Sequence, residues 1–480
     1  MRFIKLTFLP VFALLFSYTY AFGAPHYYTI NVDYALSRLT VEARYSEAVD
    51  SIRARSRKAS RFVLDARGCE DNAKIRIRSR RLLLPDDGIE CLKYTVDLDR
   101  AAKEYRGARN LSSQNIVVSP SLWMWRPTLD GEAEIRVQFQ LPENTQVSVP
   151  WKSLNGDNTL FAILESPESA SAPAVFGRFD YREITVPGST LRLTMLAGKS
   201  AMNHAAVANW IRATATDVSL TYGRFPNPSP QVVVVPVSSG RGTVAFGRVV
   251  RDGGETVELL INPDGDTAEM FTDWTATHEF SHMLLPYLDS SFHWISEGFS
   301  QYYQNILLTR SGAYDAQKMW QKLYSGFERG RKSSPELSPN EATGRSGRNS
   351  RMKVYWSGAA LALMADVALR ERSDGAETLD DVLDRLQLCC LPSSRTWTGP
   401  EFFAKLDTLV SEPLFTELYR RYADTAGFPD TSEIYARLGL SVADDTVSIL
   451  PTADLLSIRE AMTVTHSPTA EWRDRLATDD

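Results

Sequence analysis

Residues 277–282 read Thr-His-Glu-Phe-Ser-His, and residues 294–303 read Trp-Ile-Ser-Glu-Gly-Phe-Ser-Gln-Tyr-Tyr. Two side chains that are four positions apart lie one turn apart on the same face of an α-helix, so His278 and His282 can both face one metal ion. Glu279 follows the first histidine and is placed to take a proton from a water molecule that such a metal activates. The two stretches therefore predict a metal centre and the domain built around it.

The second stretch is expected to supply the third ligand, because a catalytic zinc site has three protein ligands and one open position. Apolar residues recur at helical spacing between Phe292 and Ile306, and Glu297 lies off that apolar stripe. Pro286 ends the first helix, so the second can run back beside it and bring Glu297 to the histidines. His293, one turn before Glu297, is the rival third ligand. The predicted ligands of one Zn²⁺ per chain are His278, His282 and Glu297.

This pair of stretches resembles the gluzincin metallopeptidases, which have a thermolysin-like fold and a glutamate as third zinc ligand. Residues 354–366, Val-Tyr-Trp-Ser-Gly-Ala-Ala-Leu-Ala-Leu-Met-Ala-Asp, and 427–430, Gly-Phe-Pro-Asp, are similar to the glycyl aminopeptidase family of that clan. The resemblance runs roughly from residue 232 to 440. It implies that Tyr355, three positions before Gly358, stabilises the tetrahedral intermediate of peptide hydrolysis.

The sequence departs from the family in three places. Relatives usually carry a glycine-rich edge strand that ends in a glutamate holding the free amine of the substrate, whereas residues 240–247 contain no acid. The choice between exopeptidase and endopeptidase action therefore stays open. The stretch between His282 and Glu297 is shorter than in the glycyl aminopeptidases. The family often ends in a PDZ domain, and we expect none here.

Composition and strand patterns complete the expected organisation. Acids outnumber Lys and Arg 59 to 53, for a net charge of −6, which argues against a nucleic-acid partner.

A length of 480 residues predicts two to four domains. Short alternating stretches before residue 195 predict strands, and mainly helical patterns follow residue 313. We expect an α+β multidomain protein with a signal peptide (1–24), an N-terminal β-sandwich-like domain (25–195), a thermolysin-like zincin catalytic domain (196–312), a C-terminal α-helical domain (313–445) and a tail (446–480).

The first 24 residues predict export. Arg2 and Lys5 precede an apolar run from residue 6 to 16, and small residues follow near Ala24. We expect this signal to be removed, leaving an exported, periplasmic or secreted protein without stable membrane insertion. In an oxidising compartment Cys69 and Cys91 are expected to pair, and the state of the adjacent residues Cys389 and Cys390 is left open. The polar stretch 328–351 is expected to be a solvated loop.

These observations predict an exported zinc metallopeptidase, possibly an aminopeptidase, that hydrolyses peptide bonds through a zinc-activated water with Glu279 as general base. Its expected partner is a peptide or protein substrate. Two alternatives are a zinc hydrolase of non-peptide substrates and a catalytically silent peptide-binding protein on the same fold. The preferred side chains and the oligomeric state do not follow from the sequence.

Overall fold

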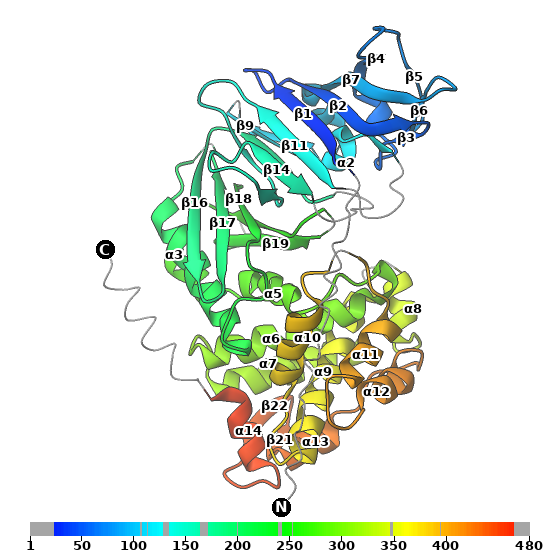
Figure 1. Ribbon diagram of the computed structural model, residues 1–480. Coiled ribbons are helices and arrows are strands. Elements are labelled where there is room, and N and C mark those ends of the chain that lie inside the picture. The colour runs from blue at the N-terminus through cyan, green and yellow to red at the C-terminus, as the bar shows by residue number, and fades with distance from the viewer. Residues whose placement is uncertain are drawn as a thin grey trace, which may run out of the picture.

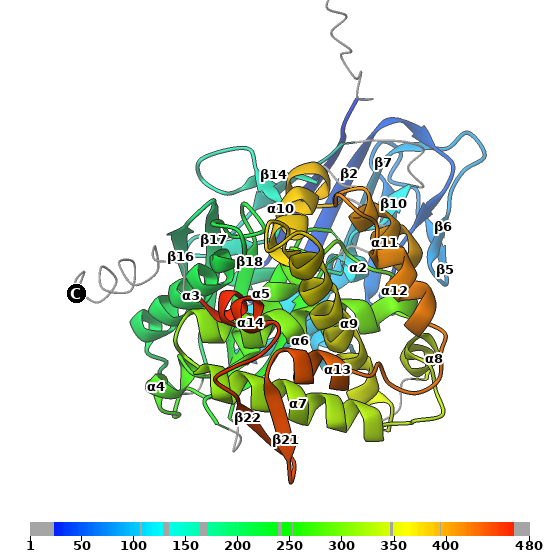
Figure 2. The same ribbon diagram turned by 90° about the horizontal axis from the view of Figure 1, so that it is seen from below.

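The computed structural model describes residues 24–464, and Figure 1 shows their arrangement. Positions inside this range that are not described are 106–107, 113, 128–133, 164–170, 199, 239–241, 252, 346–348 and 394. A β-rich N-terminal part lies at one end, a five-stranded sheet lies in the middle and most helices gather at the other end (Figure 1). Figure 2 looks onto the helical end from below. The predicted α+β multidomain class is confirmed. Of the predicted signal peptide, residues 1–23 lie outside the described residues.

The described N-terminal part is made of strands with two short α-helices and one 3₁₀ turn. Its elements are β1 (His26–Val32), β2 (Arg38–Val49), β3 (Ile52–Arg53), η1 (Ala59–Arg61), β4 (Val63–Gly68), β5 (Arg76–Arg78), β6 (Arg81–Leu83), β7 (Ile89–Asp97), α1 (Leu98–Glu104), β8 (Ala108–Ser112), β9 (Asn115–Val118), α2 (Pro120–Trp123), β10 (Arg126–Pro127), β11 (Ile135–Gln140), β12 (Gln146–Ser148), β13 (Lys152–Ser153), β14 (Leu160–Ile163) and β15 (Ala174–Gly177). They form a seven-stranded sheet, β13-β14-β11-β1-β2-β7-β4, and two four-stranded sheets. Successive side chains of a strand point to opposite faces of the sheet. In β1 the side chains of Tyr28, Ile30 and Val32 face the core and are buried, whereas Tyr27 is exposed.

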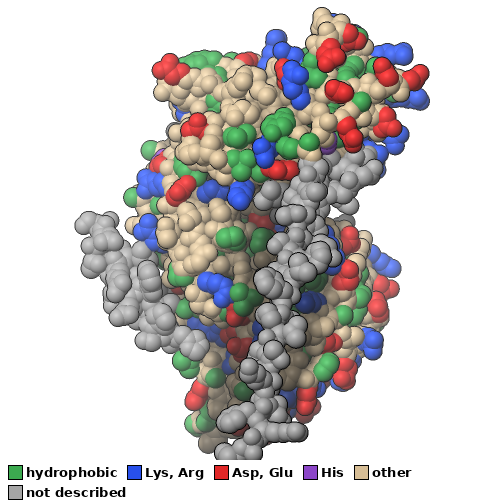
Figure 3. All heavy atoms as spheres, viewed as in Figure 1, with side chains coloured by type: hydrophobic (Ala, Val, Ile, Leu, Met, Phe, Trp, Pro, Cys, Tyr) green, Lys and Arg blue, Asp and Glu red, His purple; other side chains and the backbone are tan. Residues whose placement is uncertain are grey.

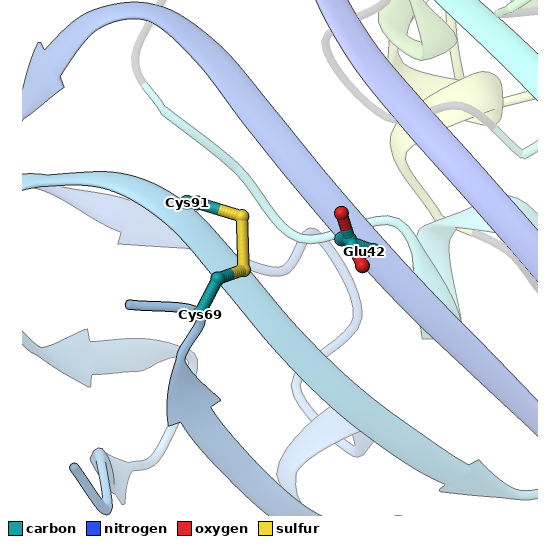
Figure 4. A group of neighbouring side chains, drawn as sticks. All are labelled: Glu42, Cys69 and Cys91. Carbon is teal, nitrogen blue, oxygen red and sulfur yellow. A yellow bond between two sulfur atoms is a disulfide. The ribbon is translucent and has the colours of Figure 1, made fainter. Parts of the chain in front are cut away.

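A disulfide joins Cys69, directly after β4, to Cys91 of β7, as predicted (Figure 4). The carboxylate of Glu42 lies close to the two sulfur atoms. Because both sulfurs are used in the disulfide, this group has no thiolate to offer a metal ion. The bond fastens the end of β4 to its neighbour in the sheet, where β4 is the outermost strand.

The middle sheet carries the elements that approach the predicted site. Its elements, with the helices beside them, are β16 (Phe179–Val186), β17 (Ser189–Leu196), α3 (His204–Val218), η2 (Ser219–Thr221), β18 (Gln231–Pro236), β19 (Val244–Val250), β20 (Thr256–Ile261) and α4 (Thr267–Met270). The strand order is β16-β17-β18-β20-β19, so β19 is an edge strand. The central strand β18 is a run of valines buried on both faces. Glu258 of β20 is buried and pairs with Arg109 of the N-terminal part and with Arg248 of β19, which ties the β-rich part to this sheet.

Helices form the remaining part. They are α5 (Thr275–Ser281), η3 (His282–Leu284), η4 (Ser290–Phe292), α6 (His293–Arg310), α7 (Ala316–Lys332), α8 (Pro339–Gly344), α9 (Arg351–Arg372), α10 (Leu379–Cys390), α11 (Gly399–Asp407), α12 (Phe415–Tyr422), α13 (Ser432–Arg437) and α14 (Leu456–Thr463). Helices α6 and α9 touch through two glycines, since a Cβ on Gly298 would overlap the backbone of Gly358. Among the described helices, α9 alone is long and apolar enough to span a membrane, but 78% of its most apolar window is buried. This burial is typical of a core helix.

Three segments differ from the sequence-based expectation or complete it. The stretch 328–351 is not a single solvated loop, because it contains the end of α7 and all of α8. Residues assigned to a tail after 445 include strand β22 (Thr446–Ile449), which pairs with β21 (Leu440–Ala443), and helix α14. Helix α14 is anchored where the buried Arg310 of α6 donates to the Met462 carbonyl. A disulfide joins Cys389 to Cys390, the two cysteines whose pairing the sequence left open.

Candidate active site

Two helices bring the three predicted metal ligands together. His278 lies in α5, His282 begins the 3₁₀ turn η3 that continues it, and Glu297 lies in the second turn of α6. His278 Nε2 is 3.2 Å from Glu297 Oε2, and His282 Nε2 is 3.8 Å from Glu297 Oε1. The two imidazole rings lie edge to face with their centroids 5.0 Å apart. All three side chains are buried. Together they form one compact group of two nitrogen donors and one carboxylate, as the spacing in the sequence predicted.

The donor set fits a zinc ion. Zn²⁺ is held in hydrolases by histidine nitrogens and a carboxylate, with one position left open. Within the described part of the chain, the ligand atoms of His278, His282 and Glu297 lie within 4.8 Å of one another. The opposite ring nitrogen of His282, Nδ1, is 2.9 Å from Ser296 Oγ, which leaves Nε2 to face Glu297. The three side chains therefore form a possible metal site whose candidate ligand atoms have already converged.

His293 stands beside this group without joining it. Its Nε2 atom is 2.8 Å from Glu297 Oε1, and its side chain is 56% exposed, whereas the side chains of the three predicted ligands are nearly inaccessible. The geometry places His293 at the open side of the site, in contact with Glu297. The group of converged ligand atoms contains Glu297 and not His293, which favours Glu297 as the third ligand.

Glu279 is held against the edge strand β19. A Cβ built on Gly247 lies 2.8 Å from Glu279 Cγ and 2.7 Å from Thr275 Cγ2, so only glycine lets the strand come this close. The Val249 N–H donates to the Glu279 carboxylate. Burial, opposed by His278 and reinforced by Glu297, raises the pKa of Glu279 to about 7. A carboxylate with this pKa exchanges a proton readily near neutral pH.

Tyr355 of α9 lies over His278. Its ring is stacked on the imidazole with centroids 6.0 Å apart and an interplanar angle of 27°. Burial, with the charge of Glu297, raises the pKa of Tyr355 to about 12, so the hydroxyl keeps its proton at neutral pH and can donate it to an oxyanion. The Trp274 ring also contacts this imidazole, edge to face, with the centroids 5.8 Å apart.

One supporting residue was not predicted from the sequence. Arg251, which follows β19 and is buried, donates to the main-chain carbonyls of His282 and of Leu285, the latter at 2.9 Å. Its Nε atom is 3.2 Å from Glu255 Oε1. Because the last carbonyls of a helix have no partner inside it, Arg251 satisfies the end of the segment that carries both histidines. No motif in the sequence marks an arginine 31 residues before its carbonyl partner.

Comparisons with known proteins show a family likeness and a shared fold. Residues 287–359 match the M61 glycyl aminopeptidase family, and this match contains Glu297 and Tyr355. No curated protein sequence matches the chain. Among solved structures, an aminopeptidase N family protein from Idiomarina loihiensis is 16% identical, with a TM-score of 0.65 over 87% of this chain and 79% of that one. An M1 zinc metallopeptidase from Deinococcus radiodurans bound to a Tyr-Ser-Ala substrate is 14% identical, with a TM-score of 0.51 over 85% and 95%.

The fold is thus shared with two-domain zinc metallopeptidases. Within that class, the chain resembles the glycyl aminopeptidase family, as its site motifs predicted.

Proposed function

We propose that this chain is an exported zinc metallopeptidase that hydrolyses peptide bonds. The observation that carries this proposal is the convergence of His278, His282 and Glu297, with the carboxylate of Glu279 directly beside them. The matched family and the shared fold support the same chemistry.

The catalytic roles follow from the position of each side chain. Bound Zn²⁺ would supply a Lewis acid that polarises the peptide carbonyl and lowers the pKa of water toward about 7. Glu279 then accepts the proton of the attacking water and passes it to the departing amine, as its raised pKa allows. Tyr355 donates its hydroxyl proton in a hydrogen bond to the oxyanion that forms on the former carbonyl oxygen.

The edge strand β19 offers a way to bind substrate backbone. An extended peptide can pair with the free edge of a sheet through main-chain hydrogen bonds. The contact of Gly247 with Glu279, the proposed general base, supports this role for the edge. No residue of β19 is acidic. A peptide bound here is therefore selected mainly by its extended shape, and both internal bonds and the first bond of a chain are candidate cleavage points.

Export is part of the proposal because of the N-terminal segment and the cysteines. The chain begins with a basic, then apolar, then small-residue segment. The disulfide between Cys69 and Cys91 is of the kind that persists in oxidising compartments. N-terminal sequencing of protein recovered from the periplasm or medium should start near residue 25, and recovery of intact residue 1 from the cytoplasm would contradict it.

The decisive experiment incubates the purified protein with a defined peptide mixture and identifies the products by mass spectrometry. Glu279→Gln is assayed in parallel, and zinc per chain is measured for both proteins. We expect cleavage by the wild type alone, with equal zinc content. Loss of single N-terminal residues would define an aminopeptidase, and internal cuts an endopeptidase. Equal activity of the variant would refute Glu279 as base, and zinc binding without cleavage of any peptide would refute the peptidase.

A further inference from the structure

The outer ring nitrogen of His278 is buried without a partner. The Nε2 atom of this ring faces Glu297, but the Nδ1 atom forms no hydrogen bond with any described residue. His282 differs, because its Nδ1 atom is 2.9 Å from Ser296 Oγ. A histidine that binds zinc through one ring nitrogen usually donates the N–H of the other to a nearby oxygen, which fixes the orientation of the ring. The protein is therefore expected to offer His278 such an oxygen.

Gln304 of α6 carries a buried oxygen that also lacks a partner. Charged side chains are spread over the surface drawn in Figure 3, whereas Gln304 is only 3% exposed. Its Oε1 atom accepts no hydrogen bond from the described part of the chain. Burying a carbonyl oxygen without a partner costs free energy, so an unpaired one in a helical core indicates a role beyond packing.

The side chains of Gln304 and His278 interact across two neighbouring helices. Gln304 lies seven positions after Glu297, two turns along the same face of α6, and α6 packs against α5, which carries His278. Burial lowers the pKa of His278, but the carboxylates of Glu297 and Glu279 and the side chain of Gln304 raise it, with a net increase. A neutral amide favours the protonated imidazole by accepting a hydrogen from it, so Gln304 presents its carbonyl oxygen to the ring. Because Nε2 faces Glu297, this oxygen is left for Nδ1.

We infer that Gln304 positions His278 for zinc by accepting a hydrogen bond from its Nδ1–H group. The inference rests on the zinc-binding part of the proposed function. A proton on Nδ1 leaves the lone pair of the imidazole on Nε2, the atom that faces Glu297. Ser296, the residue before Glu297, holds the corresponding place beside His282. Helix α6 then supplies the third metal ligand together with the residues that orient the other two.

Zinc affinity separates this positioning role from packing. The dissociation constant of the full chain for Zn²⁺ is measured by competition with a chromophoric chelator. Gln304→Met keeps the length of the side chain but removes the carbonyl, so zinc affinity should fall about 10- to 100-fold. Gln304→Leu tests the same loss with a second apolar side chain. Gln304→Glu retains an acceptor and should bind zinc more tightly than either apolar variant.

Two further measurements exclude a general loss of structure. The unfolding temperature of the zinc-free protein should not fall in Gln304→Met, because the volume of the side chain is nearly conserved. Thr309→Val is the matched control, since it removes a buried hydroxyl of the same helix that bonds only to the Asn305 carbonyl, at 2.8 Å. It should keep the zinc affinity of the wild type. The visible absorption spectrum of the Co²⁺-substituted protein should change in Gln304→Met and not in Thr309→Val, because it reports the arrangement of the ligands.

The failures are separable. Equal zinc affinity of the wild type and the two apolar variants would overturn the inference, and so would an equal loss in Thr309→Val or a Gln304→Glu protein that binds zinc no better than Gln304→Met. A wild type that binds zinc but cleaves no peptide would refute the proposed peptidase and leave the role of Gln304 standing. A wild type that binds no zinc would overturn both.

Discussion

Gly247 of the edge strand and Glu279 of the metal-ligand helix are in direct contact, and no side chain fits between them. This contact sets the edge strand β19 beside the carboxylate of Glu279, so the proposed peptide-binding edge and the proposed general base are fixed relative to each other. Gly247 does not need an unusual φ, and the requirement for glycine is one of space alone.

Gly247→Ala should therefore impair catalysis through Glu279. Its Cβ would press on Glu279 Cγ and Thr275 Cγ2, displacing the carboxylate. Misplacing a catalytic group by about 1 Å costs on the order of 100-fold in rate, so kcat should fall by about that factor while zinc content stays at one per chain. Gly156→Ala is the matched control, because nothing lies within 4 Å of a Cβ at that position. Equal kcat for the two variants would mean that the contact does not position Glu279.

Tyr355→Phe removes the proposed oxyanion donor but keeps the aromatic ring that stacks on His278. Losing one such donor costs about 3 kcal/mol of transition-state stabilisation, so kcat should drop on the order of 100-fold. KM and zinc content should change little, because the ground-state contacts remain. Steady-state kinetics with a single peptide checks this, and a rise in KM at unchanged kcat would assign Tyr355 to substrate binding.

The identity of the third ligand can be settled by zinc stoichiometry. Glu297→Gln should lose most of the bound zinc and the activity, because a buried carboxylate between the two histidines is replaced by a weaker neutral ligand. His293→Ala should keep one zinc per chain, since its side chain lies at the open side of the site. Metal analysis after dialysis distinguishes the two. The opposite pattern would make His293 the ligand.

Metal removal should inactivate the enzyme and lower its stability. A chelator should abolish peptide hydrolysis, and added Zn²⁺ should restore it. Zinc binds the folded site and not the unfolded chain, so the apo-protein should unfold at a lower temperature than the zinc form. Full activity after verified removal of zinc would contradict the proposed mechanism.

The disulfide of the N-terminal part should act on stability alone. Replacing both Cys69 and Cys91 by Ser frees a loop closed over 22 positions in sequence. Disulfides of this span contribute about 2–4 kcal/mol to the free energy of unfolding. Denaturant unfolding should show a loss of that order, with kcat unchanged because neither cysteine belongs to the metal group. A selective loss of kcat in a stable double variant would contradict this separation.

The metal group could be predicted because it depends on local spacing. The four-residue interval between His278 and His282 places both on one helical face whatever surrounds them, and the turn after Pro286 returns Glu297 to the same side. The support from Arg251 and the contact of Gly247 could not be predicted, since both depend on how β19 packs against α5. These are tertiary contacts between segments without a shared motif.

The sequence contains a local helix-start motif for α8, which the polar composition of the surrounding stretch outweighed in the prediction. The stretch 328–351 is strongly polar, which favoured a loop, yet Ser338 and Glu341 form a capping box that begins a helix. The strand and helix after residue 445 had no comparable signal. They are short, and their stability comes from packing on the helical part, as the contact between Arg310 and Met462 shows.

The glycine contact between α6 and α9 has a consequence for how the site can vary. Helix α6 carries Glu297, next to Gly298, and α9 carries Tyr355, one turn before Gly358. Main chain meets main chain at this point, so the spacing between metal ligand and oxyanion donor does not depend on the size of any intervening side chain. Substitutions in the neighbouring core should therefore lower the stability of the protein before they alter the distance between Glu297 and Tyr355.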